Sequence, residues 1–245
     1  MDAIIQARLD SKRLPRKLLL ELNGKPLIDH VVNRVKKSNL IKRVIIATTK
    51  EEEDHELVDY CEKMGLLYFR GETDNVLSRI INTCEYFQCD KIVRVCSDNP
   101  FIDTRAMDHQ INAFLTNDKI DYCTYTTYSG TPIILKPIGL FVEAISLRAL
   151  KKIKVLTKKR KYFEHVTMYI YEFENDFVIK KIRLDKSINT NYRFTVDYYE
   201  DLNFCSEILN RTRNQSMQTL INFLDNNKKL REYNLSFSSD HRKIY

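Results

Sequence analysis

A group of cations follows a short apolar run at the start of the chain. Residues 3–5, Ala-Ile-Ile, predict a buried parallel strand. The loop that follows carries Arg8, Ser11, Lys12, Arg13, Arg16 and Lys17. A loop at the carboxyl end of a first strand lies where open α/β sheets bind ligands, and cations there can hold a polyphosphate. Arg would act as a fork to two oxygens and Lys as a point charge. A solvated basic loop accounts for the charge equally well.

Two carboxylates come directly after later apolar runs. Asp98 follows residues 92–96, and Asp197 follows residues 192–196. Carboxylate oxygens suit Mg²⁺, which keeps several waters and bridges phosphates. The stretch 97–100, Ser-Asp-Asn-Pro, is also good turn chemistry, and spacing alone favours that interpretation of Asp98. Asp197 equally fits the cap of a following helix.

The elements that would position these residues alternate regularly over residues 1–126. Strands are predicted at 3–5, 44–48, 66–69, 92–96 and 122–126. Helices are predicted at 26–38, 51–64, 75–87 and 104–115, with Thr104 as the cap of the last. Strand–helix alternation of this kind requires a doubly wound parallel sheet. We therefore expect an α/β fold in which the basic loop and Asp98 meet at one sheet edge.

The second half of the chain is less regular. Strands are predicted at 138–144, 177–184 and 192–196, and helices at 146–153, 162–171, 201–209 and 216–224. Residues 151–161 hold seven Lys or Arg, which predicts a mobile, solvated connection, with phosphate contact as the other interpretation. We expect one domain over 1–245, without a linker and with a smaller inserted lobe. Its parts would be a nucleotide-binding half (1–126), an acceptor-binding half with the second metal ligand (127–210), and a C-terminal helix and variable tail (211–245).

The basic loop and both carboxylates lie in patterns of one enzyme family. The loop pattern A-R-x-x-S-x-R-L-P-x-K is matched at 7–17, with Asp10 and Arg16 where glycine is common. The pattern D-x-P-x-[IL] is matched at 98–102, and R-x-T-V-D-x-x-x-D-L at 193–202, Phe194 and 198–200 being its free positions. The chain resembles the cytidylyltransferases that activate acidic sugars, such as CMP-Kdo and CMP-sialate synthetases, and most closely their spore-coat polysaccharide branch. The resemblance covers residues 2–210 and implies a Rossmann-like nucleotide-diphospho-sugar transferase fold.

The resemblance also implies roles for individual residues. The catalytic set would be Arg8, Arg13, Lys17, Asp98 and Asp197, the two carboxylates binding Mg²⁺ as the cofactor. The nucleotide would contact Ala7, Arg8, Ser11, Arg13, Lys17, Asp74, Arg79 and Ser97. Glu143, Glu164 and His165 would be candidates for binding the acceptor substrate. Phe141 replaces an Asp that is frequent in the stretch around Glu143, which leaves the acceptor side open. A lone His on an amphipathic helix, as expected for His165, is more often structural than catalytic.

The composition limits which binding partners and which cellular compartment we expect for the protein. The net charge is +7, but 33 acidic residues accompany 40 basic ones along the chain, which favours small anionic substrates over nucleic acid. None of the six cysteines has CxxC spacing, which argues against a zinc ribbon or a redox motif. The chain opens directly into a strand, and no run has transmembrane length. We expect a cytoplasmic protein without a membrane partner, and a homodimer.

The resemblance implies in-line transfer of CMP from CTP to an acidic sugar, with release of pyrophosphate, for polysaccharide or glycoconjugate synthesis. Such chemistry is mostly positioning and charge neutralisation. A phosphorylated or phosphonate acceptor is the alternative within the same chemistry, because Phe141 alters the acceptor side. A non-catalytic nucleotide-binding homologue is a further alternative. A dinucleotide-binding oxidoreductase ranks last, because the chain lacks the G-x-G-x-x-G turn and has only five glycines.

Overall fold

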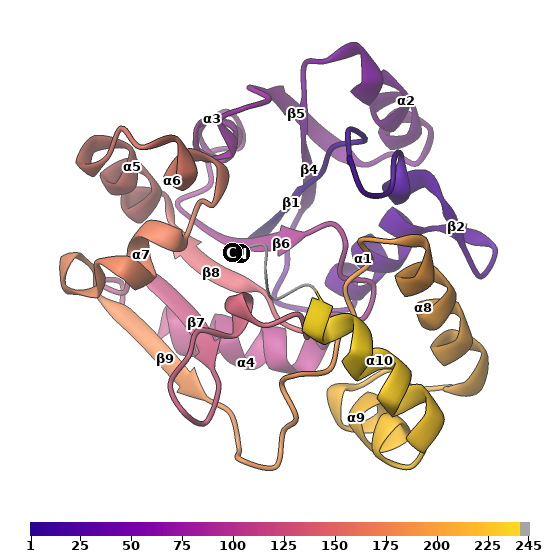
Figure 1. Ribbon diagram of the computed structural model, residues 1–245. Helices are drawn as coiled ribbons and strands as arrows, with labels where there is room; N and C mark the ends of the chain where they lie inside the picture. Colours follow the sequence, from indigo (N-terminus) through magenta and orange to yellow (C-terminus); the bar gives the residue numbers. More distant parts are fainter. Residues whose placement is uncertain (241–245) are drawn as a thin grey trace.

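A seven-stranded sheet runs through the centre of the molecule (Figure 1). The computed structural model describes residues 1–240, and side chains up to residue 236. In spatial order the strands are β5 (Leu67–Gly71), β4 (Val44–Thr49), β1 (Asp2–Gln6), β6 (Lys91–Cys96), β8 (Glu143–Ser146), β7 (Tyr122–Thr126) and β9 (Ile179–Arg183). Neighbouring strands are parallel except where β8 pairs with β6 and β7. The predicted mostly parallel α/β sheet is therefore confirmed.

Helices cover both faces of this sheet, because successive side chains of a strand point to opposite faces. On β1, Ala3 and Ile5 join one hydrophobic cluster, whereas Ile4 joins another. The first cluster takes side chains from α1 (Leu27–Lys36), α2 (His55–Lys63), α4 (Thr104–Leu115), α8 (Tyr199–Arg211) and α9 (Met217–Asp225). The second takes them from α3 (Val76–Phe87), α5 (Leu147–Leu156), α6 (Arg160–Glu164) and α7 (Met168–Glu172). The sheet is thus doubly wound, as expected.

Shorter elements join these layers. The hairpin β2 (Glu21–Leu22) and β3 (Lys25–Pro26) follows the basic loop. Single 3₁₀ turns lie at Lys17–Leu19, Glu52–Asp54, Ile133–Leu135 and Glu174–Asp176. The helix α10 (Lys228–Asp240) ends the described part of the chain. It packs against α9 and supplies Asn234, whose amide binds the backbone of Arg193 in both directions.

The cap of α4 differs from the prediction. Asp103, not Thr104, is the N-cap, and its Oδ1 accepts a hydrogen bond of 2.8 Å from the backbone N–H of Ala106. Its Oδ2 accepts another, of 2.6 Å, from the backbone N–H of Met217 at the start of α9. Thr104 instead donates to the carbonyl of Arg34 in α1. A carboxylate can accept at both oxygens, so Asp103 caps one helix and ties it to another.

Two predicted strands are wrong. The strand expected at 138–144 is confined to β8, because Gly139 has φ +61, a left-handed conformation that interrupts an extended run. Residues 192–196 form no strand, although they are largely buried. Their backbone is held instead by loops: Phe194 N–H donates to the carbonyl of Pro137, and Val196 N–H to that of Asp98. Within residues 1–240 no strand pairs with this segment, so its apolar, buried side chains alone made it resemble a strand.

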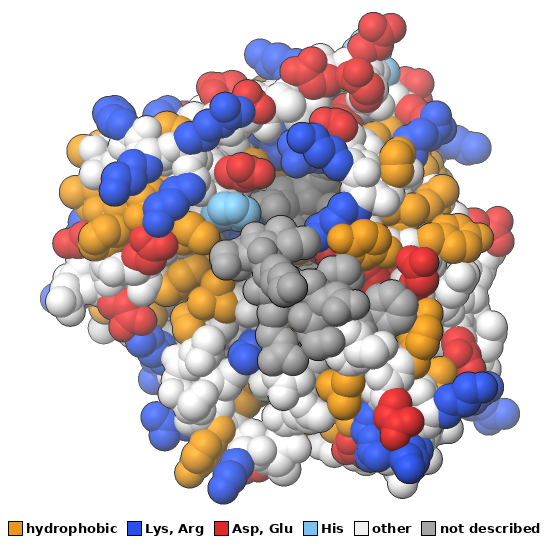
Figure 2. Space-filling model, in the orientation of Figure 1, with side chains coloured by type: hydrophobic (Ala, Val, Ile, Leu, Met, Phe, Trp, Pro, Cys, Tyr) orange, Lys and Arg blue, Asp and Glu red, His pale blue; other side chains and the backbone are white. Residues whose placement is uncertain are grey.

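One predicted connection and one predicted helix also need correction. The basic stretch 151–161 is not a plain connection, because α5 continues to Leu156, and Lys151 pairs with Glu85 of α3. The helix expected at 162–171 is divided into α6 and α7, with residues 165–167 between them. Figure 2 shows Lys and Arg side chains gathered over α5 and α6 on the viewed face. The positive charge of the stretch therefore stands on an ordered helical surface.

Within residues 1–240, the model has no helix that is both long enough and apolar enough to cross a bilayer.

Candidate active site

The candidate site lies beyond the carboxyl ends of the adjacent strands β1 and β6. The basic loop leaves β1 after Gln6, and Asp98 stands two residues past the end of β6. The N–H of Val196 donates to the carbonyl of Asp98 at 2.9 Å, which brings the segment carrying Asp197 to the same edge. Three segments far apart in the sequence therefore converge where open α/β sheets place their ligands.

Lys17 lies between the two predicted metal-binding carboxylates. Its Nζ is 3.2 Å from Oδ2 of Asp98 and 3.0 Å from Oδ1 of Asp197, and it also donates to the carbonyl of Val196 at 2.8 Å. The side chains of Lys17 and Asp197 are almost completely buried. The two carboxylates thus converge, as the sequence patterns lead us to expect, and one ammonium serves both.

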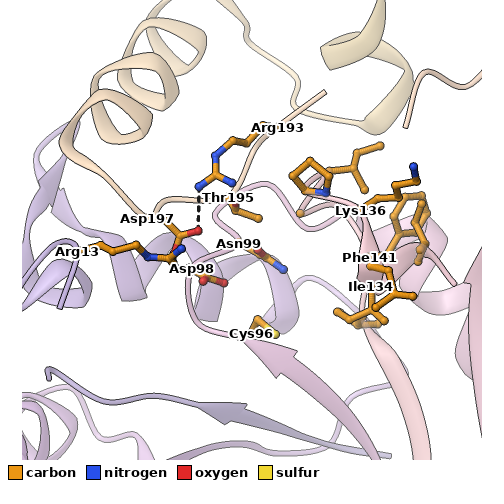
Figure 3. A pocket seen from close by; sticks show the side chains of 16 residues that line it. Arg13, Cys96, Asp98, Asn99, Ile134, Lys136, Phe141, Arg193, Thr195 and Asp197 are labelled. Atoms are coloured by element: carbon orange, nitrogen blue, oxygen red, sulfur yellow. Dashed lines mark hydrogen bonds and ion pairs between the residues drawn. The ribbon is translucent and has the colours of Figure 1, made fainter. Parts of the chain in front are cut away.

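Asp197 also binds two guanidinium groups. Arg13 reaches its Oδ1 at 2.6 Å, and Arg193 reaches its Oδ2 at 2.8 Å (Figure 3). Burial favours a raised pKa for Asp197, but the charges of Lys17, Arg193 and Arg13 outweigh it and hold the pKa below its ordinary value. Asp197 is therefore a carboxylate, and it is surrounded by positive charge.

Asp201 holds Arg193 and the backbone around Asp197 in position. Its two oxygens bind Arg193 at 2.9 Å each, and its Oδ2 also accepts from the backbone N–H groups of Asp197 and Tyr198. Asp201 thereby fixes the direction of Arg193 and the start of α8 together. The sequence interpretation treated Arg193 and Asp201 only as matched motif positions. Their spacing of eight residues around a carboxylate was the signal that could have assigned them this supporting role.

A buried carboxylate that the sequence interpretation missed anchors the basic loop. Asp54 accepts a 2.6 Å hydrogen bond from the N–H of Leu9 through Oδ1. Its Oδ2 accepts from the hydroxyl of Thr48 at 3.0 Å, and from the N–H and hydroxyl of Thr49 at 3.1 and 2.5 Å. Asp54 thus joins the loop to the end of β4. The loop closes on itself where Arg16 N–H donates to the carbonyl of Leu9 at 3.0 Å.

The remaining predicted nucleotide contacts are distributed around this loop. Ala7 is buried where the chain leaves β1, and Arg8 is exposed beyond it. Ser11 is half-buried, and its hydroxyl oxygen faces the N–H of Leu14 at 3.4 Å. Ser97 is half-buried in the turn after β6. Asp74 is exposed and pairs with Arg160 of α6 at 3.0 Å. Three of these residues therefore belong to the loop itself, whereas Ser97 follows β6 and Asp74 contacts α6.

Arg79 supports a loop and does not reach into open space. It is buried, and its Nη1 donates to the carbonyl of Glu72 at 2.6 Å. Its Nε is buried without a hydrogen-bond partner. Burial, with the charge of Arg8 as a second cause, lowers the pKa of Arg79 to about 10. The neighbouring Gly71 leaves room for it, because a Cβ there would lie 2.7 Å from Arg79 Cγ. In this structure Arg79 supports the loop 71–74, and its direct contact with the nucleotide stays a prediction.

The predicted acceptor residues do not come together. Glu143 is buried on β8, and its two oxygens are taken by Arg94 and by the hydroxyl of Tyr122. It is therefore a member of an internal network, and its predicted contact with the acceptor stays a prediction. Glu164 and His165 are exposed where α6 ends. Neither of them lines the cavity beside Asp98.

The carboxylate pair is compatible with Mg²⁺. Among the described residues, no group of three or more His, Cys, Asp or Glu could hold a metal ion. Two carboxylates completed by substrate phosphates and waters are nevertheless a usual Mg²⁺ ligand set. The ammonium of Lys17 between Asp98 and Asp197 shows that this position accommodates positive charge. The residues present therefore fit the ion that the sequence patterns imply.

Comparison with known proteins places the chain in a family. The family model described as "Cytidylyltransferase" matches residues 3–242. The chain belongs to the cytidylyltransferase family. An uncharacterised protein of Methanocaldococcus jannaschii is 34% identical to this cytidylyltransferase homologue, over 94% of the chain and 93% of the relative. The spore coat polysaccharide biosynthesis protein SpsF of Bacillus subtilis is 32% identical, over 81% of both chains.

Solved structures agree on the fold of this cytidylyltransferase homologue. A cytidylyltransferase from Leptospira borgpetersenii superposes with a TM-score of 0.84 at 24% identity, covering 94% of this chain and 95% of the other. A CMP:2-keto-3-deoxy-manno-octonic acid synthetase, solved in complex with CTP, superposes with a TM-score of 0.66 at 15% identity. That comparison covers 86% of this chain and 98% of the synthetase. At these identities the likeness shows the nucleotidyltransferase fold.

Proposed function

We propose that the protein transfers CMP from CTP to a small anionic acceptor, an acidic sugar, for surface polysaccharide or glycoconjugate biosynthesis. The observation that carries the proposal is the convergence of Asp98, Asp197 and Lys17, with Arg13 beside them, in a member of the cytidylyltransferase family. Two relatives support it. One is named for spore coat polysaccharide biosynthesis, and the other was solved with CTP.

The reaction is a displacement at the α-phosphorus of CTP. An oxygen of the acceptor forms a bond to this phosphorus, and the bond from phosphorus to the bridging oxygen breaks. Pyrophosphate leaves with that electron pair, and the proton of an attacking hydroxyl passes to solvent. The charges on the phosphates must be neutralised for this to proceed, so positioning and electrostatics supply most of the catalysis.

Different residues of the site bind the phosphates and the metal ion. Arg8, Arg13 and Lys17 hold the β- and γ-phosphates, and Asp98 and Asp197 hold Mg²⁺. When bound, the ion neutralises phosphate charge and steadies the attacking and leaving oxygens. In this structure Arg13 and Lys17 are paired with Asp197, so they exchange a carboxylate partner for phosphate oxygens when the nucleotide binds. Arg193 stays on Asp201 and keeps Asp197 in place.

Pyrophosphate release tests the proposal directly. The purified chain is assayed with CTP, ATP, GTP and UTP, each combined with sugar acids and with phosphorylated acceptors, with and without Mg²⁺. We expect turnover with CTP and a sugar acid only when Mg²⁺ is present. Thermal stabilisation by CTP and Mg²⁺ should exceed that by the other three nucleotides, because ligands that bind the native state raise Tm. Equal stabilisation by all four would contradict the cytidylyl assignment.

The compartment and the assembly complete the proposal. All six cysteines are free, which suits a reducing compartment, and we assign the protein to the cytoplasm. We assign it a homodimeric state, which sedimentation of the purified chain measures. If the chain sediments as a monomer at the concentration of the assay, the homodimer assignment is contradicted, and the proposed activity is not.

A further inference from the structure

A cavity of about 230 Å³ opens beside the two carboxylates. Asp98 and Asp197 line one side of it, and Ile134, Lys136 and Phe141 lie across from them (Figure 3). This volume is small for a ligand pocket, which commonly measures ~300–1,000 Å³, so the cavity suits one sugar-sized molecule.

Arg13 lines one end of the cavity, and the segment 133–139 lines the end across the carboxylates from it. Figure 3 shows Arg13 reaching Asp197 from one side and the segment 133–139 standing on the other. In an in-line displacement, the leaving pyrophosphate and the attacking oxygen occupy opposite sides of the α-phosphorus. If Arg13 holds the leaving phosphates at its end of the cavity, then the attacking molecule must lie at the other end, beside the segment 133–139.

Three cations line the cavity, and two of them are already paired. Arg13 binds Asp197, and Arg193 binds both Asp197 and Asp201. Lys136 is half-buried, and its side-chain ammonium forms no hydrogen bond or ion pair with any residue that the structure describes. A half-buried ammonium without a counter-charge attracts an anion. Lys136 is therefore the cation left to meet a charge that the acceptor brings.

Two polar side chains in the cavity wall also lack partners. Asn99 is only 4% exposed, and its Oδ1 has no hydrogen-bond partner in the described structure, nor has Oγ1 of Thr195. Both lie close to Gly139, where a Cβ would meet them at 3.1 Å (Asn99 Oδ1) and 2.9 Å (Thr195 Cγ2). Buried polar atoms of native proteins normally have hydrogen-bond partners. Two buried polar atoms without partners in the wall of one cavity therefore indicate a ligand that bears hydroxyl groups.

The rest of the wall is apolar. Ile134, Phe141 and Val142 face the cavity together with the aliphatic parts of its rim. An aromatic ring and branched side chains pack well against methylene groups or the face of a sugar ring, but they offer hydroxyl groups no partner. The wall thus favours a sugar whose substituents on that side are deoxygenated.

We propose that this cavity binds the acceptor through Lys136, which pairs with a carboxylate, while Asn99 and Thr195 bind hydroxyl groups and Phe141 packs on a deoxygenated part. This inference rests on the proposed function and adds its specificity residues. The single ammonium matches the one charge of a carboxylate. A phosphate monoester carries a charge of about −1.5 to −2, which a single ammonium would neutralise only in part.

Calorimetric titration of the full chain tests the assignment without turnover. The chain is first saturated with Mg²⁺ and α,β-methylene-CTP, which cannot transfer CMP. The probes are 3-deoxy-manno-octulosonate and N-acetylneuraminate, their methyl esters, and glucose 1-phosphate. We expect one of the acids to bind roughly tenfold more tightly than its ester, as for a charge-assisted hydrogen bond. Lys136→Met should remove this preference and leave the binding of the ester unchanged, whereas Lys136→Arg should restore most of it.

The controls distinguish failure of this inference from failure of the proposed function. Lys63→Met removes the same charge from the exposed surface of α2 and should change neither titration. Every variant should bind the CTP analogue as the wild type does. Failure of the wild type to bind the analogue would refute the proposed function. If the analogue binds, the inference is overturned by an acid preference that survives Lys136→Met, by binding of neither acid, or by binding of the phosphate alone.

Discussion

The ammonium of Lys17 lies 3.0 Å from Oδ1 of Asp197, although the two residues are 180 positions apart in the sequence. Burial favours a lowered pKa for Lys17, but Asp98 and Asp197 outweigh it and raise the pKa above its ordinary value. Lys17 therefore stays charged, and it joins the first loop of the chain to the last segment of the site. A site that is held together by its own opposite charges is ready to exchange them for the charges of a nucleotide.

Arg13→Lys should remove most of the activity and leave the fold intact. Lys keeps the charge but cannot reproduce the planar fork that binds two phosphate oxygens. We expect kcat/KM for CTP to fall by about 10²–10³, comparable to losing one preorganised donor. Arg16→Lys is the matched control, because Arg16 belongs to the same loop and its side chain pairs with exposed Glu56. Similar kinetics for both variants, at unchanged Tm, would mean that Arg13 does not grip phosphate.

Asp54→Asn should weaken both the fold and the binding of CTP. Backbone N–H groups of Leu9 and Thr49 face the two carboxylate oxygens, so either orientation of the amide sets its NH₂ against a donor. We expect a loss of about 1–3 kcal/mol in the free energy of unfolding, measured by urea denaturation. The KM for CTP should rise more than kcat falls, because the loop loses its anchor. Asp10→Asn, an exposed change in the same loop, should alter neither quantity; an unchanged KM for Asp54→Asn would contradict the anchoring role.

Arg16 occupies a position that glycine suits better. Its φ of 58 and ψ of 21 are left-handed, a conformation that costs a residue with a Cβ roughly 1–2 kcal/mol. Arg16→Gly and Arg16→Ala both remove the ion pair with Glu56, so their difference isolates the backbone. We expect the glycine variant to be the more stable by roughly 1 kcal/mol in urea denaturation, the reverse of the usual order. An alanine variant of equal or greater stability would show that the loop relaxes out of this conformation.

Gly71→Ala should destabilise the protein through Arg79. The new Cβ would lie 2.7 Å from Arg79 Cγ and 3.1 Å from Arg79 Cβ, which requires the two segments to move apart. We expect a loss of about 1–3 kcal/mol, as for an overpacked core position. Truncating Arg79 to Ala removes the closer contact, so the double variant should lose less stability than the two single losses combined. Strict additivity in urea denaturation would rule out this contact as the cause.

The amino-acid sequence by itself determined the local elements and the residue types of the site. The apolar runs of β1, β4, β6 and β7 and the helices between them follow from periodicity, which depends only on neighbouring residues. The position of Asp98 past a buried strand follows from the same pattern. Periodicity was less reliable where burial came from contacts with distant segments, so residues 192–196 were mistaken for a strand.

The tertiary structure decided which charges meet. Motif spacing could not show that Lys17 stands between Asp98 and Asp197, that Asp54 holds the loop at Leu9, or that Arg94 and Tyr122 take both oxygens of Glu143. These contacts join residues from different strands and loops, and each pairing depends on how the sheet and its connections pack. Local pattern limits what each residue can do, whereas the folded arrangement selects its partner and therefore its role.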